Sequence, residues 1–282
     1  MPHFQLFCRQ FQHRLLSVFA LVAVAGMAAT PALAQGDLLV APTRVVIANG
    51  GSAEVVLSNI GTELATYRIG LELRRMSEDG DIADIPEAQA NSGEQAGLAM
   101  VRYAPRRITL LPGQPQSVRI LARPPEELPD GEYRVHMSFR AIPPAVVDDP
   151  ATGGAPAGVS IRLTPVYGIT IPVIVRKGRL DVAATLANPH VVRGEQGTYL
   201  EIDMTRSGQR STYGELIGTT VKGDRIFTLK GVAIYAEVTR RVVRVPLNPE
   251  QAGQMRGAVR IEYRELPENG GQKIAELVSN IR

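Results

Sequence analysis

The 282-residue chain has one cysteine, no tryptophan and few aromatic residues of any kind, 5% in all. Cys8 lies close to the amino terminus and has no second cysteine with which to form a disulfide. The fold must therefore be stabilised by burial of its core. Beyond the first segment the histidines are His136 and His190, and with no cysteine beside them a metal site is not expected. We expect no other cofactor either.

Strong net charge and catalytic motifs are also lacking. The chain carries 31 basic and 28 acidic side chains, a formal net charge of +3. Two of the basic residues, Arg9 and Arg14, lie in the first segment, and without them the charge is 3 − 2 = +1. This balance does not give the positive surface that nucleic-acid binding requires. No nucleotide-binding glycine motif and no acid–base constellation is present, so we expect no enzyme and no catalytic residue; a hydrolase with a convergent site is the weakest alternative.

The first segment has the pattern of a secretory signal peptide. A basic stretch without acidic residues precedes the apolar run LLSVFALVAVAGMAA, which ends at the small-residue site Ala32-Leu33-Ala34. The run is shorter than the ~20 residues that a membrane-spanning helix needs. We therefore expect residues 1–34 to be cleaved after export to the periplasm, leaving no membrane anchor.

The remainder predicts an all-β fold of two tandem sandwiches. Short β-branched runs alternate with turn residues, and long apolar stripes of helical period are scarce. We place the domains at 37–176 and 179–282, with a long loop over 143–158 in the first of them. The expected strands are 43–48, 53–58, 66–73, 107–110, 116–122 and 133–142 in the first half, and 199–205, 215–221, 232–237, 241–246 and 258–263 in the second.

One alternating run, residues 159–175, is longer than a sandwich strand usually is. Its odd positions are almost all apolar, over ~17 residues against a usual five or six. One interpretation is that part of this face is bare and awaits a strand from a partner. The other is that the run forms two short core strands with a bend at Pro165 or Gly168.

Several segments resemble the periplasmic chaperones of chaperone–usher pilus systems. The most specific is LPDGEYRVHMSFRAIPP at 128–144, and PTRVVI at 42–47 is similar to the first strand of that family. YAPRRITLLPGQPQSVRIL at 103–121 is similar to its middle strands. In the second half, RSGQRSTYGEL and GVAIYAE lie where these chaperones have a turn, a Tyr-Gly step and a buried strand.

The resemblance implies two immunoglobulin-like sandwiches in a boomerang arrangement, with a cleft between them. It implies that Arg44 binds the C-terminal carboxylate of a pilus subunit, as a planar guanidinium can do with two hydrogen bonds. It assigns strand donation to Val159, Ile161 and Leu163, which would fill the groove of an incomplete subunit. The later apolar residues, Ile169, Ile171, Val173 and Val175, would then pack inside the chaperone.

In one respect the sequence differs from the family pattern. The family has a lysine as the second basic contact of the cleft, and the position that aligns with it is Thr170. Arg162 and Lys177 are the alternatives for this contact. The sequence therefore predicts a divergent member of the family.

Taken together, we expect a periplasmic chaperone that binds pilus or fimbrial subunits by donor-strand complementation and delivers them to an outer-membrane usher. Self-association of the free protein through its bare strand is left open. The alternative function is that of a structural or adhesive surface protein built of two sandwiches.

Overall fold

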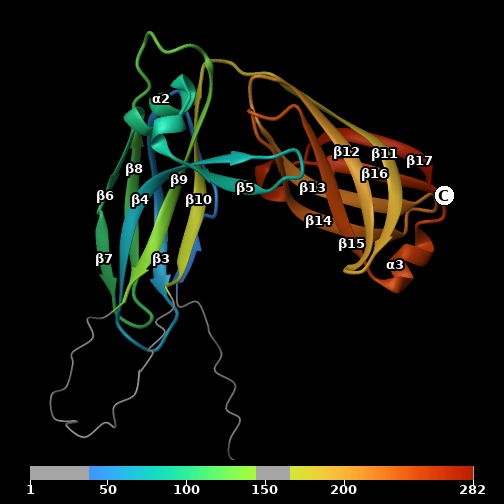
Figure 1. The fold of residues 1–282 in the computed structure, drawn as a ribbon, viewed down its shortest axis with the longest axis horizontal. Helices are drawn as coiled ribbons and strands as arrows, with labels where there is room; N and C mark the ends of the chain where they lie inside the picture. The colour runs from blue at the N-terminus through green and yellow to red at the C-terminus, as the bar shows by residue number, and fades with distance from the viewer. Residues whose placement is uncertain (1–37, 144–165, 282) are drawn as a thin grey trace, which may run out of the picture. The chain divides into compact units, whose positions relative to one another are not determined.

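The computed structural model describes residues 38–143 and 166–281. Strands make up 63% of the structure, and α2 and α3 are the α-helices of the described part. The described residues belong to one compact unit that contains two β-sandwiches in tandem, as Figure 1 shows. This confirms the predicted all-β, immunoglobulin-like fold class with two sandwiches. Within the described ranges, no helix is both long and apolar enough to cross a membrane.

The first sandwich contains β1 (Leu38–Ala41), β2 (Val45–Ala48), β3 (Gly51–Asn59), β4 (Ala65–Met76), β5 (Ile82–Ile85), η1 (Glu87–Gln89), α2 (Ser92–Met100), β6 (Val101–Ala104), β7 (Arg107–Leu110), β8 (Pro115–Ala122), β9 (Gly131–Ile142) and β10 (Gly168–Lys177). One of its sheets has the order β1-β3-β8-β6. The other has the order β2-β10-β9-β4-β5, and β7 also pairs with β4. β1 pairs with β3, whereas β2 pairs in parallel with β10 of the other sheet. The chain therefore passes from one sheet to the other at Pro42.

The second sandwich contains β11 (Val182–Gly194), β12 (Gly197–Gly208), β13 (Thr212–Thr220), β14 (Arg225–Ile234), β15 (Arg240–Leu247), α3 (Pro249–Gln254), β16 (Gly257–Arg264), η2 (Pro267–Asn269) and β17 (Lys273–Ile281). Its sheets have the orders β11-β12-β15 and β14-β13-β16-β17. The predicted boundary at 176–179 falls where β10 ends and the link to β11 begins.

The described half of the long alternating run is β10, which is covered on both faces. Ile171, Val173 and Val175 are buried in the core of the first sandwich, and Ile169 packs against it, as predicted. Ile174 points to the opposite face and is fully buried with side chains of the second sandwich. The contact with the second sandwich explains why Ile174, at an even position of the run, is apolar although it points away from the core of the first sandwich.

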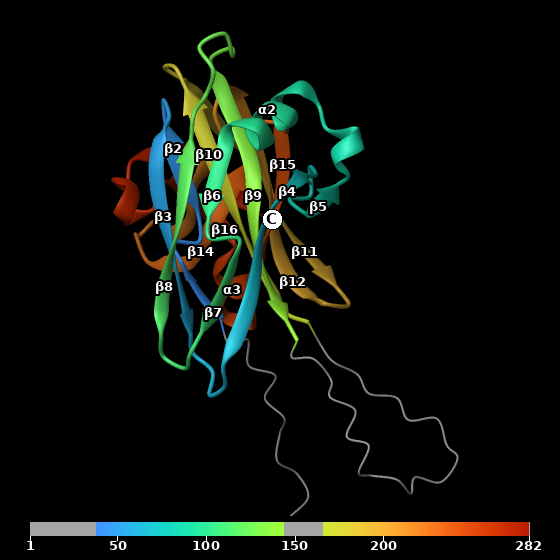
Figure 2. The ribbon, with the colours of Figure 1, turned by 90° about the vertical axis from the view of Figure 1, so that its left-hand side faces the viewer.

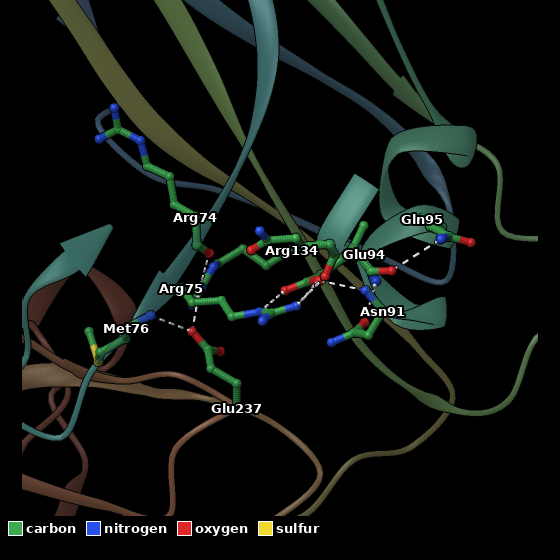
Figure 3. Close-up of polar contacts among 10 residues, drawn as sticks. Arg74, Arg75, Met76, Asn91, Glu94, Gln95, Arg134 and Glu237 are labelled. Carbon is green, nitrogen blue, oxygen red and sulfur yellow. Dashed lines mark hydrogen bonds and ion pairs between the residues drawn. The ribbon is translucent and has the colours of Figure 1, made fainter. Parts of the chain in front are cut away.

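Helix α2 was not predicted, because its apolar pattern is weak. It begins with a capping box, in which Asn91 Oδ1 accepts from the Glu94 N–H at 2.9 Å and Glu94 Oε2 accepts from the Asn91 N–H at 2.8 Å. The same Glu94 carboxylate accepts two hydrogen bonds of 2.6 Å from Arg75 of β4, and this contact lowers its pKa (Figure 3). The helix packs on β9, as the view in Figure 2 shows, and is thereby joined to both strands.

Candidate functional site

Arg44 occupies the short link between β1 and β2. Its neighbour Val45 is buried in the core of the first sandwich, so the alternation of the strand directs Arg44 away from that core. Arg44 Nη2 donates to Ser211 Oγ at 3.2 Å, and Nη1 lies 3.5 Å from Tyr235 Oη, the limit of a hydrogen bond. The guanidinium carbon is 4.5 Å from the ring centroid of Tyr213 and 5.5 Å from that of Tyr235. All three partners belong to the second sandwich.

These partners orient the Arg44 guanidinium without neutralising it. Two aromatic faces and a hydroxyl carry no formal charge, and among the described residues no carboxylate oxygen lies within 4.0 Å of Arg44. Burial lowers the pKa of Arg44, while the nearby Tyr235 and Glu132 act in the opposite direction. Because an arginine starts from so high a pKa, the side chain stays charged at neutral pH.

Arg44 lines a cavity of about 690 Å³ to which both sandwiches contribute. The first sandwich supplies the residues around Arg44 and the end of β10, including Arg176. The second supplies the turn between β12 and β13, which contains Arg210, and the connection between β16 and β17, which ends at Lys273. The lining thus holds four basic side chains, together with Glu265 and Glu268 from the connection between β16 and β17.

Two of these four cations already have a carboxylate partner. Arg176 Nε lies 2.9 Å from Glu132 Oε2, whose side chain is only 1% exposed. The same oxygen accepts the backbone N–H of Ser211 at 3.1 Å, so Glu132 links the two sandwiches. Lys273 pairs with Glu276 on its own strand. Arg44 and Arg210 are the two that have no ion pair with a described residue.

The other residues predicted for the site are placed differently. Thr170 is half-buried in β10, opposite Ser138, and is not among the residues that line the cavity. Lys177 donates to the backbone carbonyls of Pro125, Glu126 and Leu128, so its ammonium group is engaged within the first sandwich. Val159, Ile161, Arg162 and Leu163 lie outside the described residues.

Sequence reasoning did not single out Ser211, Tyr213 or Tyr235. All three fall within the two second-half segments that resemble the chaperone family, RSGQRSTYGEL and GVAIYAE. That similarity marked the segments, but it did not indicate which side chains face the first sandwich. Their role follows from contacts across 167 and 191 residues of sequence, which no local pattern records.

A second set of contacts between the sandwiches is centred on Glu237. Its Oε1 accepts from Arg134 Nη2 at 2.5 Å and from the Met76 N–H at 2.9 Å, as Figure 3 shows. The Arg134 guanidinium also stacks on Tyr235, 3.6 Å from its ring centroid. Beside these polar groups, Met76 and Ile174 pack against Ala233 and Tyr235. Tyr235 is therefore flanked by Arg134 and Arg44, both from the first sandwich.

The turn between β4 and β5 adds a backbone contact to β15. The Val242 N–H donates to the Glu78 carbonyl at 2.8 Å. Gly80 in this turn has φ +87°, and a Cβ there would lie 2.3 Å from Arg241 Nε. A glycine is needed at this position both for its backbone conformation and for the close approach of the arginine.

His136 is buried on the outer face of β9, among positive charges. Its side chain is 3% exposed, and Nδ1 has no hydrogen-bond partner among the described residues. Burial, together with repulsion from Arg134, Arg74 and Arg44, lowers its pKa to about 3. The imidazole is therefore neutral at neutral pH. Over the described ranges, no cluster of three or more His, Cys, Asp or Glu residues could hold a metal ion.

Comparisons with known proteins gave structural similarity alone. Scans against family models and curated protein sequences found no match. Many similar solved structures are chaperones of chaperone–usher pili, at 11–15% identity. The E. coli chaperone DraB is 15% identical with a TM-score of 0.46, over 87% of this chain and 96% of that chain. The SafB chaperone in complex with SafA pilin, from Salmonella enterica, is 15% identical with a TM-score of 0.44, over 89% and 98%.

A third similar structure is the complex of CsuC with the tip subunit CsuE, from the archaic Csu pili of Acinetobacter baumannii. It is 12% identical with a TM-score of 0.42, over 86% of this chain and 97% of that chain. These proteins are chaperones of the kind that the sequence motifs resemble. All three TM-scores are below 0.5, so this similarity does not assign a function to the chain.

Replacing Glu237 with Gln should destabilise the protein by about 1–3 kcal/mol, because the Arg134 side chain is only 8% exposed and would lose its counter-charge. The measurement is the free energy of unfolding in urea. Glu78→Gln is the matched control, since Glu78 pairs with Arg240 at 3.9 Å and is 66% exposed, so its loss should cost no more than about 0.5 kcal/mol. Equal effects of the two substitutions would contradict the assignment of Glu237.

His136 should make the protein lose stability on acidification. In the unfolded chain the imidazole binds a proton below pH 6.5, whereas in the folded protein it does so only near pH 3. The free energy of unfolding is therefore highest above pH 6.5 and decreases as the pH falls from 6.5 towards 3. At pH 5 the loss should be about 1–2 kcal/mol. In His136→Gln the unfolding free energy should change less between pH 7 and pH 5 than in the wild type. Parallel curves for the wild type and His136→Gln would contradict the prediction.

Proposed function

We propose that this protein is a periplasmic chaperone that binds pilus or fimbrial subunits and presents them to an outer-membrane usher. The observation that carries the proposal is the Arg44 guanidinium, which is held in place by neutral partners, has no carboxylate partner among the described residues and lines an open cavity. Such a group is suited to a carboxylate from another molecule. The motif PTRVVI, in which Arg44 lies, resembles the first strand of these chaperones.

In this function Arg44 binds the C-terminal carboxylate of the subunit and so fixes its register. A guanidinium presents its N–H groups as a rigid fork, which holds a carboxylate in one orientation. Tyr213 and Tyr235 fix the plane of the guanidinium before the ligand arrives, which reduces the ordering cost of binding. The residues that face Arg44 are thus part of the binding site, although they belong to the other sandwich.

Donor-strand complementation by Val159, Ile161 and Leu163 is the second part of the proposal. It is supported by the alternating sequence of residues 159–175 and by the family resemblance, and these three residues lie outside the described ranges. Each aliphatic side chain buried in a subunit groove would contribute about 1.5–3 kcal/mol before ordering costs. Export by the segment 1–34, delivery to an usher and the lack of enzymatic activity belong to the same proposal. Thr170 and Arg162 remain proposed second contacts.

Replacing Arg44 with Gln should weaken subunit binding about tenfold or more, because a hydrogen bond to a charged group contributes about 1.5–3 kcal/mol. Arg44→Lys keeps the charge but not the fork, and its affinity should fall between those of the wild type and Arg44→Gln. The measurement is a titration of the purified chaperone with a pilus subunit that lacks its final strand. An affinity unchanged in Arg44→Gln would remove the carboxylate-binding role.

Replacing Ile161 and Leu163 with Glu should leave the protein folded and abolish capture of subunits on coexpression. A charged side chain cannot enter an apolar groove without losing its hydration. Capture is measured by copurification, and folding by circular dichroism. The matched control is Val278→Glu, at an apolar side chain of β17 that is 54% exposed and should tolerate the charge. Retained capture would contradict strand donation, and ligand binding without subunits would favour an adhesive protein.

A further inference from the structure

The unpaired cation Arg210 points to a second anion contact, supplied by the second sandwich. Of the four basic residues that line the cavity, Arg176 and Lys273 are neutralised by Glu132 and Glu276. Arg210 is half-buried, and its side chain has no hydrogen bond or ion pair with any described residue. Glu265 and Glu268 also line the cavity, but neither forms an ion pair with Arg210. The Arg210 guanidinium therefore has no direct partner among the described residues and is available to bind an anion.

The turn that carries Arg210 is held in place by a buried arginine. Arg206 is 7% exposed, and its Nη1 donates to the carbonyls of Gly208 at 2.7 Å and Arg210 at 3.2 Å. The other side of the same guanidinium donates to the Ala236 carbonyl at 2.8 Å and the Val238 carbonyl at 3.2 Å. The backbone of the turn is thus tied to the segment after β14. The position from which the Arg210 side chain extends is therefore fixed.

The residue after Arg210 joins this turn to the first sandwich. The Ser211 N–H donates to Glu132 at 3.1 Å, and Ser211 Oγ accepts from Arg44 at 3.2 Å. Ser211 itself is 1% exposed. Arg210 is therefore next in sequence to a residue that contacts Arg44, and both arginines line the same cavity. The two guanidinium groups thus belong to different sandwiches and line the same cavity.

We propose that Arg210 is a second carboxylate-binding residue, so that a bound carboxylate is held by one guanidinium from each sandwich. This inference rests on the proposed function, since it concerns the same ligand group that Arg44 would bind. A carboxylate has two oxygens and can accept about four hydrogen bonds. The N–H groups that Arg44 has free cannot supply all of them. Two of the Arg44 nitrogens already donate toward Ser211 and Tyr235. Arg210 supplies the second cation that the family pattern places in β10, where this chain has Thr170.

The test uses a short alternating valine–serine peptide in three forms. One has a free C-terminal carboxylate, one has a C-terminal amide, and one has a C-terminal amide with a final glutamate, which separates a chain-terminal from a side-chain carboxylate. Affinities of the full-length mature protein for each form are measured by calorimetry or NMR titration. The wild type should bind the free acid at least tenfold more tightly than the amide.

The variant Arg210→Gln should reduce the preference for the free acid about three- to tenfold and leave the amide affinity unchanged. Arg225→Gln, at an exposed arginine of β14 away from the cavity, should keep the wild-type preference. Arg44→Gln should also reduce it, and the double variant should lose it. Unchanged thermal unfolding of Arg210→Gln would show that the loss is one of binding.

Each outcome decides between the two proposals. If Arg44→Gln loses the preference and Arg210→Gln keeps it within twofold, Arg210 is not a ligand contact and the proposed function stands. If the wild type itself does not prefer the free acid, carboxylate binding at this cavity is wrong for both arginines. If the glutamate form binds as tightly as the free acid, the site recognises a carboxylate rather than a chain end, and the two-arginine contact is retained.

Discussion

The central constraint on this structure is a positive charge that is held in place without being neutralised. Arg44 lies against Tyr213 and Tyr235 and donates to Ser211, and these partners fix its orientation through ring faces and a hydroxyl. Cation–π contacts attract a guanidinium but leave its N–H edge available. A carboxylate in the same place would have cancelled the charge. The cavity can therefore offer an oriented cation to a ligand from another molecule.

Two carboxylates at the junction of the sandwiches are bound by other groups, whereas Glu265 and Glu268 line the cavity without an ion pair to a described residue. Glu132 is bound to Arg176 and to the Ser211 N–H, and Glu237 is bound to Arg134 and to the Met76 N–H. Buried ion pairs of this kind contribute little net stability, but breaking one is costly, because the remaining charge stays buried. The Arg134–Glu237 pair thus joins the sandwiches directly, and Glu132 joins them through the hydrogen bond from the Ser211 N–H. His136 is neutral because burial, and after it repulsion from Arg134, Arg74 and Arg44, lowers its pKa.

The segment between β4 and β6 contributes to this arrangement from the first sandwich. Its turn reaches β15 through the hydrogen bond from Val242 to Glu78, and its helix α2 is tied to β4 through Glu94 and Arg75. At the end of β4, the Arg74 carbonyl accepts a hydrogen bond from Arg134, and the Met76 N–H donates one to Glu237. The turn after β4 therefore adds a contact between the sandwiches, next to the one that Arg74 and Met76 of β4 make.

The sequence by itself determined the all-β class and the apolar odd positions of β10, because a period of two is a local property of extended backbone. It did not reveal α2, whose strongest signal is the Asn91–Glu94 cap, or the burial of Ile174 on the face opposite the core. Only the tertiary structure decided which cations are paired. Arg176 pairs with Glu132, and Lys177 donates to backbone carbonyls that include that of Pro125, whereas Arg44 and Arg210 have no ion pair with a described residue. These contacts join residues far apart in the chain, so no local sequence pattern predicts them.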